Sequence, residues 1–90
     1  MASNFKILVH RNSNNLHLKL MGDFDGSSAH QLLNLIDRQN LEDSEIFIHT
    51  NCLTELVPFG RDVFIHNLRP LMKKPVKIFF TGDHASQLSA

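Results

Sequence analysis

Two segments near the start of the chain have the composition of β-strands and the alternation of apolar and polar residues that is typical of strands with one solvent-exposed face. They are NFKILVH at 4–10 and LHLKLM at 16–21, joined by RNSNN at 11–15. Every other residue of the second segment is a leucine: Leu16, Leu18 and Leu20. The asparagines of the connection tolerate turn conformations. We therefore predict a β-hairpin that turns its leucines inward.

An amphipathic helix is predicted at 28–40, after GDFDG at 22–26 breaks the strand. Its apolar residues fall at positions i, i+3, i+4 and i+7, as Ala29, Leu32, Leu33 and Ile36. Ser27 or Ser28 is suited to cap the first turn, because a hydroxyl oxygen can accept a hydrogen bond from a free backbone amide.

A second helix is predicted at 59–69, where apolar residues again recur at helical spacing. Pro58 suits its start, because the N–H that proline lacks is not needed there. This helix belongs to the stretch 50–64, TNCLTELVPFGRDVF, which leaves a strand, crosses a short loop and opens a helix. A short third helix is predicted at 83–89, with Asp83 as its cap.

Two further strands are predicted at 45–49 and 76–80. Ile46, Phe47 and Ile48 follow one another without polar interruption, which is typical of a central strand covered on both faces. We expect the later strand, VKIFF, to be buried as well. The order ββαβαβα predicts an α/β fold, a mixed sheet of about four strands with flanking helices. We assign residues 1–90 to a single domain.

Composition excludes several classes of function. The chain has 9 Lys and Arg against 9 Asp and Glu, so no charge excess attracts it to nucleic acid or to a membrane surface. Apolar runs are too short to span a bilayer, and the first residues lack the apolar core of a signal peptide. A soluble cytoplasmic protein is expected. Cys52 is the only cysteine, which excludes an internal disulfide.

The segment 16–29, LHLKLMGDFDGSSA, is similar to a signature of STAS domains. That signature is a strand followed by glycine, an acidic residue, an apolar residue, aspartate and a helix. The module is shared by anti-sigma-factor antagonists and the cytoplasmic tails of sulfate transporters. The family's Asp-Ser-Ser-Gly loop corresponds here to Val57, Pro58, Phe59 and Gly60. The resemblance covers residues 5–81 and implies a STAS-like fold and a non-enzymatic regulatory role.

This chain departs from the family at the loop that carries its switch. In phosphorylation-controlled members, the serine after the aspartate is modified by a kinase that is also the binding partner. Val57 replaces that aspartate and Pro58 replaces that serine, so the resemblance implies a loop without the switch. The chain stops at Ala90, before the family's usual final strand and helix. We expect a smaller or partly uncovered sheet, which self-association could offset.

We predict that a protein partner binds along 56–64 and at the adjoining turn 25–28. The residues assigned to this surface are Val57, Pro58, Phe59, Gly60, Arg61, Phe64, Asp25, Ser27 and Ser28. Aromatic and arginine side chains dominate many interfaces. Phe59 is equally suited to close the core under the loop, and the sequence leaves both roles open. Gly60 supplies either a close backbone approach or a permissive backbone angle.

The turn at 25–28 also supports an alternative function, a sensor for a small ligand or anion such as a nucleotide or phosphate. A helix N-terminus offers free amides to an anion. The same residues are ordinary helix caps, and two nearby carboxylates, Asp23 and Asp25, would repel phosphate. The chain has neither of the usual glycine-rich phosphate motifs.

Enzymatic and metal-binding functions have little support in the sequence. None of the six histidines forms HxH, HxxxH or HExxH spacing, so no metal site is predicted. His10 and His17 flank the hairpin and are expected to face each other. A nucleophilic pair of His49 and Cys52 would need a third, orienting group, and Cys52 is better interpreted as a small buried side chain. The lysines Lys73, Lys74 and Lys77 are interpreted as a solvated connection.

The sequence thus predicts a STAS-like module that binds a protein partner, an anti-sigma-type kinase or another regulatory protein. No cofactor or metal, and no contact with nucleic acid or membrane, is expected. Self-association is left open.

Overall fold

The computed structural model describes residues 4–38, 45–71 and 77–88. Its elements are β1 (Lys6–Arg11), β2 (Asn15–Phe24), α1 (Gly26–Arg38), β3 (Glu45–Leu56), α2 (Pro58–Leu71), β4 (Lys77–Thr81) and α3 (Ala85–Leu88). The sheet has the order β1-β2-β3-β4. β1 is antiparallel to β2, whereas β2, β3 and β4 are mutually parallel. The predicted α/β architecture, with its mixed four-stranded sheet, is confirmed.

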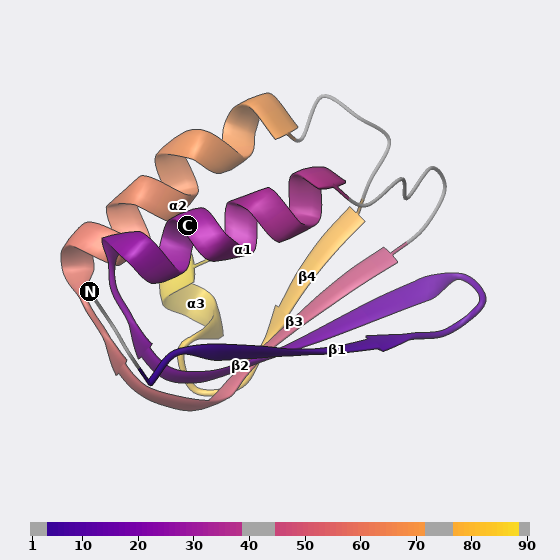
Figure 1. Cartoon of the computed structure of the whole chain (residues 1–90), viewed down its shortest axis with the longest axis horizontal. Coiled ribbons are helices and arrows are strands. Elements are labelled where there is room, and N and C mark those ends of the chain that lie inside the picture. Colours follow the sequence, from indigo (N-terminus) through magenta and orange to yellow (C-terminus); the bar gives the residue numbers. More distant parts are fainter. Residues whose placement is uncertain (1–3, 39–44, 72–76, 89–90) are drawn as a thin grey trace.

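The two long helices cover one face of the sheet. α1 and α2 lie side by side above the strands, and no described helix lies against the opposite face (Figure 1). Right-handed crossovers that step in the same direction along a sheet leave their helices on the same side. β2, β3 and β4 are neighbours in chain order, so both crossovers step in that way. We call the uncovered side of the sheet the open face.

The core fills the space between the sheet and the helices. The three leucines of β2 are fully buried, as their alternation predicted. They belong to one apolar cluster with residues of α1, β3 and α2, including Ala29, Leu32, Ile46, Ile48 and Phe64. None of the described helices is both long and apolar enough to cross a membrane.

The prediction that the central strand is covered on both faces is wrong. Ile46 and Ile48 are buried under the helices, but Phe47 points to the open face and is half-buried. It is flanked there by the rings of His17 and Phe79, at centroid distances of 5.0 and 5.2 Å. An apolar run can therefore reflect a row of rings instead of a second helical layer. β4 has no fully buried residue, because it lies at the edge of the described sheet.

Two strands are longer than predicted. β2 continues through Gly22 to Phe24, with shifts of register on both sides of the glycine, which has a φ of 90°. Such bulges let a strand pass a glycine without ending. β3 extends beyond His49 to Leu56, because residues as far as Leu56 pair with β2. Residues 50–56, expected to include a loop, are strand.

The helix boundaries also shift. α1 begins at Gly26, and Asp25 caps it instead of Ser27 or Ser28, since the Ser28 amide donates to Asp25 Oδ1 at 2.9 Å. α2 covers the predicted segment and continues past it through Pro70. α3 begins two residues after Asp83 and is only four residues long. The predicted ends at 39–40 and 89, the connection 41–44, and Lys73 and Lys74 lie outside the described residues.

Replacing Phe64 by alanine should lower the free energy of unfolding by about 3–5 kcal/mol. Its ring is fully buried and meets Phe24 and Phe80 edge to face, at 6.0 and 5.9 Å, so truncation leaves a cavity. Urea denaturation followed by circular dichroism measures the loss. Phe59→Ala is the matched control on the same helix, because that ring is 68% exposed. Equal losses in the two variants would contradict the placement of Phe64.

Candidate functional site

Two connections meet where β2 and β3 end. The strands are parallel, so their carboxyl ends lie at the same edge of the sheet. Asp25 alone separates β2 from α1, and Val57 alone separates β3 from α2. The Val57 amide donates to the Phe24 carbonyl at 2.9 Å, which holds the connections together. We call residues 25–27 and 57–62 the loop cluster.

Gly60 lets α2 approach the Asp25 turn. A Cβ atom on Gly60 would lie 2.6 Å from the carbonyl carbon of Asp25 and 2.8 Å from its Cα, closer than real Cβ atoms come. Gly60 is buried and lies within a helix. Of the two roles that the sequence left open for this glycine, the structure therefore selects the close backbone approach.

Phe59 lies outside the core. Its side chain is 68% exposed, the largest exposed fraction among the big apolar residues of the described chain. The ring rests over Gly26, where an added Cβ would lie 2.8 Å from Phe59 Cε2. Leu56 and Val57, the other residues that could have closed the core, are half-buried. Phe59 is thus available for contact with a partner.

Polar side chains continue from Phe59 along α2. Arg61 Nη2 lies 3.0 Å from Asp62 Oδ1, with the two side chains 42% and 65% exposed. Exposed pairs of this kind add little to stability. Further along, Asp62, Ile65, His66 and Arg69 line a shallow depression. The sequence pattern did not single out Ile65, His66 and Arg69, although their positions three, four and seven residues after Asp62 place them on one side of the helix.

Three residues assigned to the binding surface are buried: Gly60, Phe64 and Ser28. Phe64 belongs to the core. Ser28 is also fully buried, and its hydroxyl donates to the Asp23 carbonyl at 2.8 Å and lies 3.0 Å from Asp25 Oδ1. A partner or a kinase would have to disrupt the fold to reach either of these two side chains. Ser27 is half-buried.

The start of α1 already has a negatively charged cap. The Asp25 carboxylate accepts the Ser28 amide, which is one of the donors that an anion would use. The anion-sensing alternative would therefore have to compete with a side chain of the protein itself.

A second polar cluster lies on the open face. His17 Nδ1 and His49 Nε2 are 3.0 Å apart, and His49 Nδ1 lies 2.7 Å from Thr81 Oγ1. These contacts join β2, β3 and β4 side by side. His10 pairs with His17 in the register, with ring centroids 6.4 Å apart, as expected.

The contacts of the open-face histidines run between neighbouring strands. Both ring nitrogens of His49 face neighbouring strands, and Cys52 is half-buried instead of buried. Within the described ranges, no group of three or more His, Cys, Asp or Glu side chains is placed to hold a metal ion. Burial lowers the pKa of His49 below its ordinary value of 6.5, and the charges of His17 and Lys19 add to this effect.

Gly60→Ala should destabilise the protein by about 1–3 kcal/mol, because the new methyl group would force α2 away from the Asp25 backbone. Helix propensity alone predicts the opposite sign, a gain of about 1 kcal/mol. Urea denaturation measures the change in the free energy of unfolding and decides between the two signs.

Gly26→Ala is the control for this variant. Its methyl group would meet only the exposed Phe59 ring, which can rotate away, so we expect little loss. A stabilised Gly60→Ala variant would show that the two loops are not in close contact.

Stability should decrease as the pH falls below about 6.5. A lowered pKa in the folded state means that folding favours neutral His49. Its contribution is complete above pH 6.5 and is lost as the pH falls through the lower folded-state pKa. Melting temperatures at about pH 7.5 and about pH 5 measure the effect. His49→Gln should reduce this pH dependence, and His30→Gln, on the exposed side of α1, should not. The same pH dependence in His49→Gln would contradict the assignment.

Solved structures share this fold at low sequence identity. A crystal structure of Mglu matches with a TM-score of 0.74 and 16% identity, over 84% of this chain and 19% of that chain. The anti-sigma factor antagonist SpoIIAA in its unphosphorylated form matches with a TM-score of 0.54 and 11% identity, over 93% of this chain and 79% of that chain.

A third match is an uncharacterized protein of the DUF3478 family from Shewanella loihica PV-4, described as having a SpoIIAA-like fold. Its TM-score is 0.52 at 20% identity, over 92% of this chain and 75% of that chain. The chain spans between 19% and 27% of the Mglu chains. No protein-family model and no curated protein matches the sequence. The structure and these likenesses together show that the chain has the STAS-like fold of the anti-sigma factor antagonist SpoIIAA.

Proposed function

We propose that this chain is a non-enzymatic regulatory module that binds a protein partner through the loop cluster. The observation that carries the proposal is the position of Phe59, a large aromatic side chain that is 68% exposed at the start of α2. Aromatic side chains of this kind are frequent anchors of protein interfaces.

The loop cluster is well suited to binding because it is already ordered. Gly60 packs against the Asp25 backbone, and the Val57 amide is bonded to Phe24. The Phe59 ring rests over Gly26. Binding would therefore cost little conformational entropy at this surface, which favours affinity.

Polar side chains, with charges of both signs, lie close to Phe59 in α2. Arg61 and Asp62 come two and three residues after it, and His66 and Arg69 continue along the helix. An apolar centre with a polar rim is the usual composition of a protein interface. We include Ile65 in this surface, since it lines the same depression.

The STAS-like fold suggests the class of partner. In the family that the sequence resembles, this loop contacts a regulatory kinase, and phosphorylation of a serine controls the contact. Pro58 occupies that position here, at the first residue of α2, and cannot accept a phosphate. We therefore propose constitutive binding to an anti-sigma-type kinase or another regulatory protein in the cytoplasm.

Phe59→Ala should abolish partner binding and leave the fold intact. In affinity capture from the source cell, at least one protein that is retained by the natural chain should be lost by this variant. Leu8→Ala is the matched control, because Leu8 is 52% exposed on a different element, β1. This control should retain the same protein.

A set of captured proteins that is identical for Phe59→Ala and the natural chain would refute binding through the loop cluster. The anion-sensing alternative remains a separate prediction. It would show itself as amide chemical-shift changes confined to residues 25–28 on titration with phosphate or ATP.

A further inference from the structure

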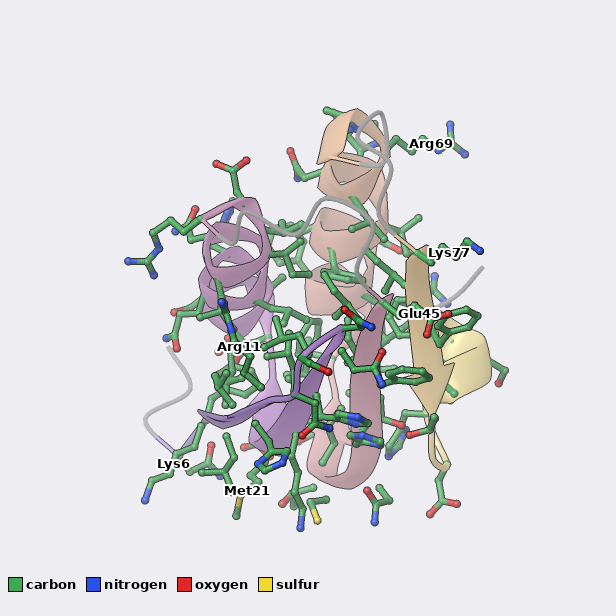
Figure 2. All side chains as sticks on the ribbon, turned by 90° about the vertical axis from the view of Figure 1, so that its right-hand side faces the viewer. Lys6, Arg11, Met21, Glu45, Arg69 and Lys77 are labelled. Atoms are coloured by element: carbon green, nitrogen blue, oxygen red, sulfur yellow. The ribbon has the colours of Figure 1, made fainter. Side chains whose placement is uncertain are left out.

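β4 is an edge strand in the described part of the sheet. It pairs with β3 along one side only, and Figure 2 shows it at the border of the sheet, with Lys77 near its start. Phe79 is the middle residue of its five and is 42% exposed. An edge strand offers unpaired backbone groups to another strand.

A row of parallel rings crosses the open face and ends at this edge. The ring of Phe47 is 5.0 Å from that of His17, with an angle of 12° between the planes, and 5.2 Å from that of Phe79, at 20°. These distances match the spacing between neighbouring strands, about 4.8 Å. Phe79 has no ring partner among the described residues on its outer side. One more strand at this edge could therefore place another ring against it.

We propose that β4 pairs in antiparallel fashion with β4 of a second copy of this chain, around a two-fold axis at Phe79. Because the strand has five residues, the register that pairs its whole length places Phe79 opposite Phe79. Ile78 then faces Phe80, and Lys77 faces Thr81. The two sheets become one continuous sheet of eight strands, and the row of rings continues across the axis.

This register brings no like charges together. Lys77 is the only charged residue of β4, and its partner Thr81 is neutral. Ile78 and Phe80 lie on the helix side and pack against the core of their own chain, so their pairing extends an apolar layer. Cross-strand pairs of apolar residues stabilise a sheet.

The other edge of the described sheet fits self-pairing less completely. Residues directly opposite each other in a strand pair point to the same face, so a two-fold pairing of β1 must be centred on one residue, Leu8 or Val9. Either centre leaves one of the six residues of β1 unpaired, whereas a centre at Phe79 pairs all five residues of β4. The Leu8→Lys variant described below distinguishes pairing through β1 from pairing through β4.

Contact between two open faces is also disfavoured. Figure 2 shows Lys6 and Met21 projecting on the side of the sheet away from the helices. The alternation of the strands places Lys19 and Lys77 on this same face, with Asp23 and Glu45 as the acidic residues among them. Two such faces would bring an excess of positive charge together. The β4 edge is therefore the favoured contact, and it leaves the loop cluster free for a protein partner.

Sedimentation equilibrium over a range of concentrations tests the proposal. The mass of the natural chain should rise toward twice the 10.3 kDa of one chain. Phe79→Lys should keep it monomeric, because two ammonium groups would meet at the axis. Leu8→Lys, which adds the same charge to β1, should still dimerise. Circular dichroism confirms that each variant is folded.

Disulfide formation tests the register. In a Cys52→Ser background, Phe79→Cys places two cysteines opposite each other, within the Cα distance that a disulfide requires. Lys77→Cys places its two copies four residues out of register, roughly 13 Å apart. Under mild oxidation, Phe79→Cys should form covalent dimers at least tenfold faster than Lys77→Cys.

Three results would overturn the proposal. The first is a natural chain that is monomeric at every concentration. The second is a dimer that the Leu8→Lys substitution dissociates and the Phe79→Lys substitution does not. This result would indicate that the two copies contact each other through β1 or through the open face. The third is equal rates of cross-linking for the two cysteine variants, which would exclude the two-fold register at Phe79. None of these results bears on binding through the loop cluster, so the two proposals can fail independently.

Discussion

The parallel pairing of β2, β3 and β4 is the constraint on which the other features depend. Parallel neighbours need a crossover, and the sequential order makes both crossovers step in the same direction. α1 and α2 therefore cover one face, and the other stays open (Figure 1). The same parallel alignment brings the carboxyl ends of β2 and β3 together. The loop cluster and the open face thus both follow from the parallel pairing of these strands.

Backbone packing holds the loop cluster in place. Gly60 allows the first turn of α2 to lie against Asp25, while Asp25 caps α1 through the Ser28 amide. Phe59 can remain exposed without disturbing this arrangement, because its ring rests on Gly26 outside the core. The hydroxyl of Ser28 stabilises the turn between β2 and α1, because it donates a hydrogen bond to the Asp23 carbonyl. An exposed aromatic ring thus stands on a closely packed backbone.

The open face is stabilised in another way. Parallel strands usually have helices on both sides. Here the uncovered side carries a row of rings and the hydrogen bonds of His17, His49 and Thr81, which connect three strands laterally. Stacked rings shield one another, so Phe47 is half-buried without a helix above it. The row ends at Phe79, where the sheet offers its edge.

The sequence by itself determined the order of the elements, the inward leucines of β2 and the STAS-like fold. These depend on local periodicity and on a motif within one short segment. It did not reveal that residues 50–56 continue β3, since a strand extends as far as its neighbour offers hydrogen bonds. The sequence also could not show that Phe59 is exposed and Phe64 is buried. Both residues fit the apolar pattern of α2, and only the docking of that helix on the sheet buries one and exposes the other. Asp25 became the cap for a related reason, because the end of β2 fixes where α1 can begin.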